Sequence, residues 1–241
     1  MTAQAPDRAH WTRVARQWIA WARTPGHDAF WSYRAGLRAF LGPGEGSAIE
    51  VGCGEGRVSR LLGELGWRVT ATDPVAELLA AARESQSAEA YAIAPASALP
   101  FEDGRFDLAV AYNMLMDVAD VPGALAELRR VLRPDGALVL SIVHPLADLV
   151  QAAGANGALG DQPYFERRRF EATEARDGIS MEFAGWSQPI EAYALALEGA
   201  GFTIAALREP RPDPGADARL DRWRRLPLFL WLKARPVEGP W

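Results

Sequence analysis

The chain has 241 residues, 49% of them hydrophobic, which is enough to build one large α/β domain with insertions. Its formal net charge of -5 opposes binding to a polyanion, so nucleic acid is not an expected partner. Cys53 is the single cysteine, which excludes an internal disulfide, and no Cys/His cluster has the spacing of a zinc site. Because the sequence lacks a secretory-signal pattern and any apolar run of ~20 residues, we expect a cytoplasmic protein without metal or membrane, as a monomer or homodimer.

The predicted elements begin with a helical cover over residues 1–46. Residues 11–23 have helical spacing, and a second short helix follows before a Gly/Pro-rich linker. From residue 47 the pattern alternates between strand and helix. Strands are expected at 47–51, 68–72, 90–94, 106–112 and 137–143, with helices at 58–65, 74–85 and 122–132. Five βα units in series predict a parallel, doubly wound sheet with helices on both faces.

The last hundred residues depart from this alternation. Residues 145–189 are expected to form an inserted cap segment, a Gly/Ala-rich loop followed by a hairpin whose turn is Asp177-Gly178. A helix at 190–200 and strands at 202–207 and 226–233 complete the domain, and the two strands should pair antiparallel at one edge. The predicted main domain therefore spans residues 47–241.

A glycine-rich loop follows the first predicted strand. The segment contains Glu50, Gly52, Gly54 and Gly56, and the glycines allow the backbone to approach a ligand closely. The dinucleotide fingerprint GxGxxG would require a glycine where Arg57 stands. A pyrophosphate site is thus disfavoured, although an NAD-dependent oxidoreductase is retained as an alternative.

An acidic residue ends the second predicted strand. The carboxylate of Asp73 can accept hydrogen bonds from both hydroxyls of a ribose, and Asp73 before Pro74 is equally a good helix N-cap. Together with the glycine loop, this residue predicts a site for a nucleoside.

Four segments in this order, EVGCGEG, TATDP, ALPFEDGRFDLAVAYNMLMDVAD and LRRVLRPDGALVLSI, resemble the class I S-adenosylmethionine-dependent methyltransferases, in particular their small-molecule branch. The resemblance covers roughly residues 47–143. It implies a Rossmann-like, seven-stranded sheet of order 3-2-1-4-5-7-6 with strand 7 antiparallel. It also implies that S-adenosylmethionine is the cofactor.

The same resemblance assigns the cofactor contacts. The methionine part would lie against the loop after the first strand, with Glu50, Gly52, Cys53 and Gly54. Asp73 would bind the ribose, and Pro74 would lie beside the adenine. Tyr112 and Asn113, which close the fourth strand, would meet the amino group of the cofactor and the acceptor.

The chain departs from the family at one position. Relatives often carry D-A-x-x-L-P-F, whose Asp binds the adenine amino group, whereas this chain reads Pro95-Ala96-Ser97-Ala98-Leu99-Pro100-Phe101. The backbone of Ala96 and Ser97 is therefore expected to reach the ring instead. Losing one such polar contact costs about 1 kcal/mol.

The acceptor side offers candidates with ordinary alternatives. Three residues could contact an acceptor or remove its proton as a general base: His144, Asp117 and Tyr112. Equally, His144 could start a turn and Asp117 could cap a short helix. Five side chains of the N-terminal cover and the cap segment could line the pocket for the acceptor: Trp21, His27, Trp31, Tyr33 and Trp186. Ordinary packing would explain most of them equally well, and a surface position is expected for His27.

The expected function is methyl transfer to a small organic acceptor, such as an aromatic or specialised metabolite. A nucleic-acid amino-methyltransferase would carry an Asn/Asp-Pro-Pro-aromatic run where this chain reads AYNMLM. A non-catalytic cofactor-binding protein remains an alternative, because a retained binding site looks the same in sequence.

Overall fold

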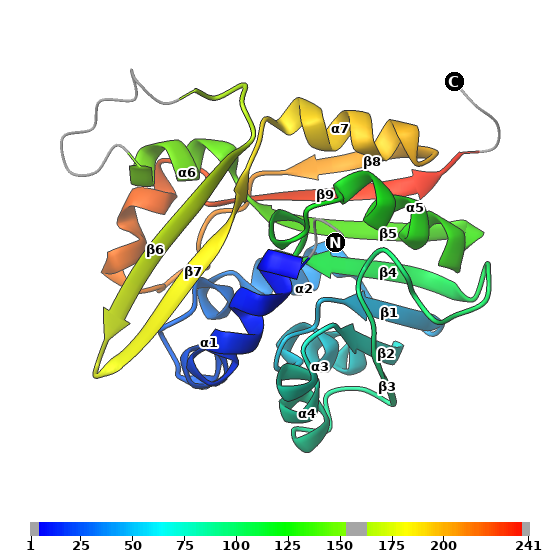
Figure 1. Cartoon of the computed structure of the whole chain (residues 1–241), viewed down its shortest axis with the longest axis horizontal. Coiled ribbons are helices and arrows are strands. Elements are labelled where there is room, and N and C mark those ends of the chain that lie inside the picture. Colours follow the sequence, from blue (N-terminus) through cyan, green and yellow to red (C-terminus); the bar gives the residue numbers. More distant parts are fainter. Residues whose placement is uncertain (1–4, 153–162, 238–241) are drawn as a thin grey trace.

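The computed structural model describes residues 5–152 and 163–237. Its centre is a seven-stranded sheet of order β3-β2-β1-β4-β5-β9-β8, in which β9 runs antiparallel to both of its neighbours (Figure 1). Strands β6 (Arg168–Arg176) and β7 (Ile179–Ser187) form a separate hairpin. Without them the order is the expected 3-2-1-4-5-7-6, so the predicted fold class is confirmed. The sheet strands are β1 (Ser47–Val51), β2 (Arg68–Asp73), β3 (Ala90–Ile93), β4 (Phe106–Tyr112), β5 (Leu132–Val143), β8 (Phe202–Arg208) and β9 (Phe229–Pro236).

The central strand β4 shows why the sheet is buried on both faces. Successive side chains of a strand point to opposite faces. Ala109 and Ala111 accordingly join one hydrophobic cluster, while Leu108, Val110 and Tyr112 join the other. The apolar run of residues 108–112 therefore forms the part of the strand that is covered on both sides, as in other parallel sheets.

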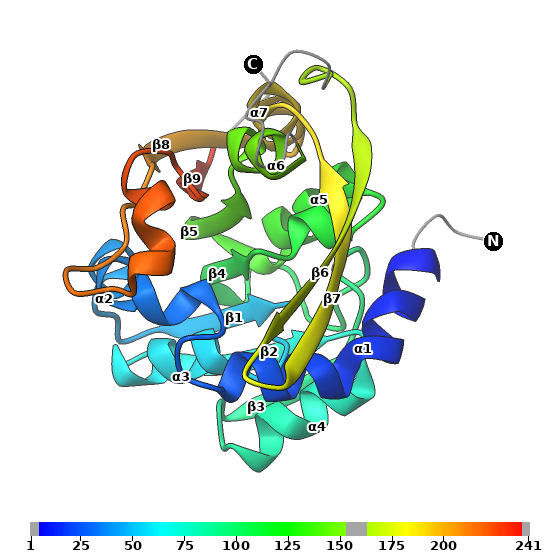
Figure 2. The same cartoon turned by 90° about the vertical axis from the view of Figure 1, so that its left-hand side faces the viewer.

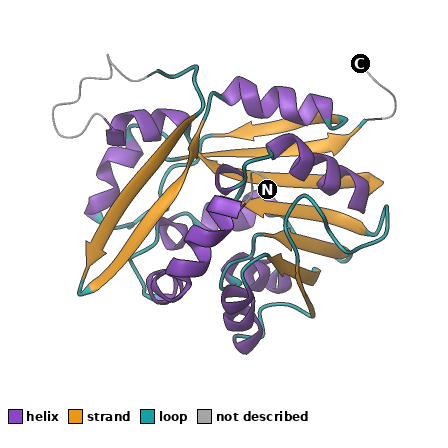
Figure 3. Cartoon of the chain, in the orientation of Figure 1, coloured by secondary structure: helices purple, strands orange, loops and turns teal. Residues whose placement is uncertain are grey.

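Helices cover the two faces (Figure 3). The helices are α1 (Ala5–Arg23), α2 (Arg34–Leu41), α3 (Arg57–Glu64), α4 (Ala76–Glu84), α5 (Val121–Val131), α6 (Pro145–Ala152) and α7 (Ile190–Gly199), with short 3-10 helices η1 (Ala29–Ser32), η2 (Leu115–Asp117) and η4 (Ala218–Arg224). Apolar side chains of α5 and α7 belong to one cluster, and those of α2 and α3 belong to the other. None of the helices in residues 5–152 and 163–237 combines the length and hydropathy needed to cross a membrane.

Helix α1 and the hairpin form a cover beyond one end of the sheet. The hairpin consists of β6 (Arg168–Arg176) and β7 (Ile179–Ser187), and its turn residues Asp177 and Gly178 have φ of +48° and +80°, as the sequence predicted for this turn. Figure 1 shows the hairpin beside α1, and Figure 2 shows it crossing the end of the sheet that faces the viewer. Aromatic rings hold the two together, since Phe183 lies edge-on to Trp18 and Trp21.

Several element boundaries differ from expectation. Helix α1 begins six residues before Trp11, because its first turns, APDRAH, carry no apolar stripe to reveal them. Helix α4 begins at Ala76 and not at Pro74, since the Asp73 carboxylate already accepts the Val75 N–H in the turn that precedes it.

The start of the inserted segment was also mispredicted. Residues 145–152 were expected to belong to a loop, but they form helix α6, which packs Ala147 and Leu149 inward. The Gly/Ala-rich stretch that motivated the loop prediction lies mostly at 153–160, outside the described residues. Strand β5 is assigned from Leu132 rather than from 137, with a register shift opposite β4 between Phe106 and Leu108.

Candidate active site

A cavity of about 1250 Å³ opens at the carboxyl ends of the parallel strands. Its floor comes from the loops that follow β1, β2, β3 and β4, and its walls come from α1, the β6–β7 hairpin and the start of α6. This is where open α/β sheets bind ligands, next to the point at which the strand order reverses. Here β1 lies between β2 and β4, so the loop after β1 occupies that point.

The glycine loop after β1 is shaped for close approach. Gly52 has φ of +70° and Gly54 has φ of +56°, values that L-residues rarely adopt. A Cβ on Gly52 would lie 2.7 Å from the Met114 Cβ, and one on Gly54 would lie 2.9 Å from the Trp18 Nε1. Bare backbone is therefore required at both positions, and helix α1 is in contact with the loop through Trp18.

Asp73 ties the end of β2 to this loop. Its Oδ2 accepts the Gly54 N–H at 2.9 Å and its Oδ1 accepts the Val75 N–H at 2.8 Å. The residue is buried at the cavity wall, and burial raises the pKa of its carboxyl to about 6. A carboxylate has about four lone-pair sites, so two remain for the hydroxyls of a ribose.

Glu50 is the second buried acid of the loop. Its carboxyl accepts a short hydrogen bond from the Ser59 hydroxyl, and burial raises its pKa to about 8. The group is consequently protonated for the most part at neutral pH unless a cation binds beside it.

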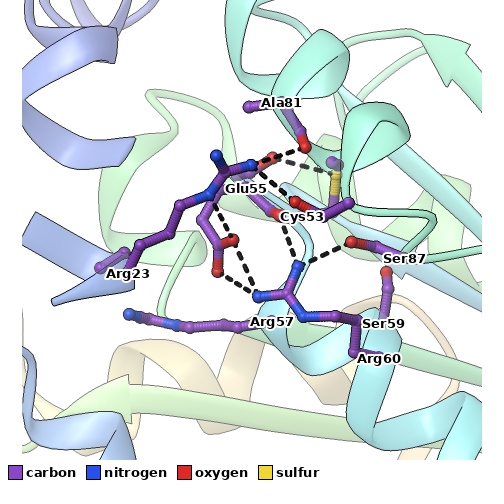
Figure 4. Close-up of polar contacts among 12 residues, drawn as sticks. Arg23, Cys53, Glu55, Arg57, Ser59, Arg60, Ala81 and Ser87 are labelled. Carbon is purple, nitrogen blue, oxygen red and sulfur yellow. Dashed lines mark hydrogen bonds and ion pairs between the residues drawn. The ribbon is translucent and has the colours of Figure 1, made fainter. Parts of the chain in front are cut away.

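Glu55 anchors the loop to three helices (Figure 4). Its carboxylate, 1% exposed, accepts two hydrogen bonds from Arg60 at 2.9 and 2.8 Å, and Arg23 of α1 pairs with it at 3.4 Å. Arg60 also donates to Ser87, and Arg23 donates to the Ala81 carbonyl of α4. The loop conformation is thus fixed by charge-assisted hydrogen bonds that bring together residues distant in sequence.

Arg57 is directed away from that network, as Figure 4 shows. Its guanidinium carbon lies 4.7 Å from the Trp18 ring centroid, 5.0 Å from that of Phe30 and 6.0 Å from that of Tyr112. Asp28 is its ion-pair partner at 2.8 Å. In the sequence, Arg57 stands out only as the residue that replaces the third glycine of the fingerprint. Its place directly after a glycine loop is the one signal that could have predicted its position at the cavity.

The structure brings several predicted acceptor-side residues to the cavity: Trp21, His27, Tyr112, Asn113 and Asp117. Asn113 has φ of +51°, and its side-chain oxygen accepts the Ser141 hydroxyl at 2.6 Å, which ties the end of β4 to β5. The predicted surface position of His27 was wrong. Its ring is 4% exposed because it packs edge-on against Trp21 and hydrogen-bonds through Nε2 to the Arg176 carbonyl at 3.0 Å.

His144 does not line the cavity. Its Nδ1 accepts the Leu146 N–H at 3.1 Å at the start of α6, and its Nε2 lies 3.1 Å from the Glu209 carboxylate. Burial lowers the pKa of its imidazole. The position matches the alternative role, a residue that begins a turn.

Four other predicted contacts also lie outside the cavity lining: Trp31, Tyr33, Ser97 and Trp186. The Trp31 ring is 37% exposed and its Nε1 donates to the Ala22 carbonyl at 3.0 Å. Tyr33 is fully buried in the core against Phe229. The Trp186 ring stacks beneath Arg167, whose guanidinium carbon is 4.4 Å from it.

Asp148, in the first turn of α6, was missed by the sequence analysis. It lines the cavity and is 9% exposed. Burial raises its pKa to about 6, against the opposing effects of a hydrogen bond from Ser187 and the charge of Arg168. The residue was missed because its segment was expected to be a loop without defined side-chain directions.

No group of three or more His, Cys, Asp or Glu is arranged to hold a metal ion anywhere in the part of the chain that the structure describes. The cradle at Gly52 and Gly54 and the carboxylate of Asp73 together fit the adenosyl and methionine parts of S-adenosylmethionine. Pro74 and Ala96 line the cavity beyond Asp73, where the adenine would lie.

Comparison with known proteins agrees with this geometry. Residues 49–140 match a family described as a methyltransferase domain. Over 119 residues the chain is 37% identical to malonyl-[acyl-carrier protein] O-methyltransferase of Serratia marcescens, covering 49% of this chain and 43% of that protein. The chain spans about half the length of the curated relatives it matches.

Solved structures share the fold over most of the chain. An S-adenosylmethionine-dependent methyltransferase from Mesorhizobium loti has a TM-score of 0.64 at 24% identity, covering 86% of this chain and 98% of that one. The 1,6-didemethyltoxoflavin-N1-methyltransferase of Burkholderia thailandensis, solved with bound 1,6-didemethyltoxoflavin and S-adenosylhomocysteine, has a TM-score of 0.61 at 22% identity, covering 99% of this chain and 92% of that one. The sequence of residues 49–140 thus matches a methyltransferase domain, and the fold of the chain is that of the class I S-adenosylmethionine-dependent methyltransferases.

Proposed function

We propose that this chain transfers the methyl group of S-adenosylmethionine to a small organic acceptor bound in the same cavity. The observation that carries the proposal is the junction of Asp73 with the glycine loop, where a buried carboxylate and bare backbone meet at the switch point of the sheet. A nicotinamide dinucleotide fits less well, because Arg57 occupies the place of the third glycine of its fingerprint.

Cofactor binding falls to residues at the ends of the first three strands and in the loops that follow them. Gly52, Cys53 and Gly54 present backbone to the methionine part, and the nearby Glu50 carboxyl can ionise to accept its ammonium. Asp73 binds the ribose hydroxyls. Pro74 and Ala96 flank the adenine, and Ser97, which lies outside the lining, has no part in the proposal.

S-adenosylmethionine supplies an electrophilic methyl group on a sulfonium. The protein has to align the acceptor in line with it and exclude water. Helix α1 and the hairpin supply the cover, since Trp18, Trp21 and Phe183 form its inner wall. The apolar part of the acceptor would pack there.

Where the acceptor must lose a proton, Asp148 is the proposed base. It is buried at the cavity, and its pKa of about 6 leaves it ionised at neutral pH but basic enough to take a proton. Tyr112 is unsuited to this role because burial raises the pKa of its phenol, which keeps the hydroxyl protonated. His144 faces Glu209 outside the cavity lining.

Turnover tests the proposal. Purified protein is incubated with S-adenosylmethionine and a fractionated small-molecule extract, and S-adenosylhomocysteine formation is measured by mass spectrometry. The proposal expects formation that depends on one or a few fractions and is lost in Asp148→Asn when the acceptor requires deprotonation. Tight S-adenosylhomocysteine binding without turnover in any fraction would instead indicate a non-catalytic binding protein.

We further propose a cytoplasmic enzyme with no nucleic-acid partner, a monomer or homodimer.

A further inference from the structure

Arg57 places a buried guanidinium at the cavity wall. The side chain is 8% exposed, and its Nη1 has no partner in hydrogen-bond geometry. Asp28 Oδ1, which also accepts the Phe30 N–H, lies 2.8 Å from that nitrogen, in an ion pair that lacks hydrogen-bond geometry. The guanidinium therefore has an N–H at the cavity wall that is not used in a hydrogen bond.

Tyr112 adds a second unused donor at the same place. It closes β4, is 6% exposed, and its hydroxyl has no partner. Its ring centroid is 6.0 Å from the Arg57 guanidinium carbon. Five side chains in residues 5–152 and 163–237 have a buried polar atom without a partner, and Arg57 and Tyr112 are the two that line the cavity.

Unmade hydrogen bonds of this kind are costly. A buried donor without a hydrogen bond destabilises a protein, so two at one cavity wall indicate that a ligand supplies the acceptors. A guanidinium offers five N–H donors in a planar fork, and a carboxylate can take two of them while its other lone pairs accept from a phenol.

On the basis of the proposed methyl transfer, we infer that Arg57 and Tyr112 form a subsite for a carboxylate of the acceptor, so that the substrate is an organic acid. Two ligands could bring a carboxylate here, the acceptor and the methionine part of the cofactor. The acceptor is favoured because Trp18 of α1 and Phe30 of η1 present their rings to Arg57, and the N-terminal cover to which they belong is the proposed wall for the apolar part of the acceptor.

The surroundings of the guanidinium suit the body of such an acid. Trp18 and Phe30 present rings to Arg57, at 4.7 and 5.0 Å from its guanidinium carbon. Aromatic rings around a guanidinium give an apolar surface with a single positive charge in it. Such a surface favours a ligand that has an anionic end and an apolar body.

Calorimetry on the full chain with benzoate as the probe tests the subsite. Benzyl alcohol is the neutral match, and each titration is done with and without saturating S-adenosylhomocysteine. We expect benzoate to bind at least tenfold more tightly than benzyl alcohol. Arg57→Gln should lower benzoate affinity at least tenfold, and Tyr112→Phe, which removes only the hydroxyl, about threefold or more.

Arg176→Gln is the matched control. It removes the same charge from the same cavity, but the Arg176 Nη1 already donates to the His27 carbonyl at 2.6 Å. Its benzoate affinity should stay within twofold of wild type. Equal benzoate affinity in wild type, Arg57→Gln and Tyr112→Phe would overturn the inference.

The affinity for S-adenosylhomocysteine separates the two sources of carboxylate. We expect it to stay within threefold in Arg57→Gln, whereas a parallel tenfold loss would assign the subsite to the cofactor and overturn the inference. Failure of wild-type protein to bind S-adenosylhomocysteine would instead contradict the proposed function, while Arg57-dependent benzoate binding in the same sample would still support the carboxylate site.

Discussion

The carboxylate of Asp73, at the end of β2, accepts a 2.9 Å hydrogen bond from the backbone of Gly54, in the loop that follows β1. One acid thereby fixes the separation between the two segments that would bind the methionine part and the ribose of S-adenosylmethionine. The second oxygen accepts the Val75 N–H, so the turn into α4 is held as well. The nucleoside site and the local fold depend on the same side chain.

Removal of this carboxylate should therefore affect both. We expect Asp73→Ala to lower S-adenosylhomocysteine affinity at least tenfold and the free energy of unfolding by about 1–3 kcal/mol, since two buried backbone N–H groups lose their acceptor. Calorimetry and urea denaturation measure the two effects. Asp177→Asn at the exposed hairpin turn is the control and should change neither, because asparagine tolerates the left-handed conformation found there.

Gly54→Ala should destabilise the loop by more than the strain of a positive φ at an alanine would cause. The new Cβ would meet Trp18 Nε1 at 2.9 Å in a residue with φ of +56°. Gly104→Ala is the matched control, because Gly104 has φ of +63° with open space around it. We expect the control to cost about 1 kcal/mol of stability and to leave cofactor affinity unchanged. Gly54→Ala should cost more and weaken S-adenosylhomocysteine binding at least tenfold; equal behaviour of the two variants would contradict the close contact with α1.

The pKa of Glu50 predicts a pH dependence of stability. Because burial raises this pKa from the ordinary value of 4.5 to about 8, the folded state holds a proton that the unfolded state loses between these values. The contribution of Glu50 to stability is fully present below about pH 4.5 and is lost as pH rises to about 8. Glu50→Gln should flatten that decline, by on the order of a few kcal/mol across the interval.

Urea denaturation of the ligand-free protein between pH 5 and 8.5 measures this effect. Glu89→Gln, at an exposed position, is the control and should retain the wild-type slope. A slope unchanged in Glu50→Gln would mean that Glu50 is ionised in the folded protein, which its burial argues against.

Substitutions of Asp148 and of His144 should have different effects on catalysis. If Asp148 takes the acceptor proton, kcat rises with pH through about 6, and Asp148→Asn removes that dependence and lowers kcat about 100-fold or more. His144→Asn keeps an oxygen that can accept the Leu146 N–H, so α6 should still start in the same way. We expect it to retain kcat within threefold; the reverse pattern would restore His144 as the base.

The placement of the glycine loop beside Asp73 could be predicted from sequence because its signals are local. Gly52, Gly54 and Asp73 stand at strand ends, where the fold itself determines their position relative to one another. The remainder depends on long-range packing. Glu209, 65 residues further along the chain than His144, determines where that imidazole lies, and no local pattern reveals this pairing.

Arg57 and Asp148 were missed for a related reason. The spacing of residues places Arg57 at the start of α3, but only the arrival of Trp18 and Phe30 from the N-terminal segment makes it a buried cation. Asp148 becomes a cavity residue because the stretch after β5 is helical, contrary to the expected loop. Side-chain direction at both positions is a tertiary property.

Isothermal titration calorimetry of the full chain with S-adenosylhomocysteine, and separately with NAD, tests the central claim most directly. We predict saturable one-to-one binding of S-adenosylhomocysteine with a Kd of about 1 mM or tighter, weakened at least tenfold by Asp73→Ala, and no measurable heat with NAD. Folded protein that binds NAD and gives no heat with S-adenosylhomocysteine would contradict the account.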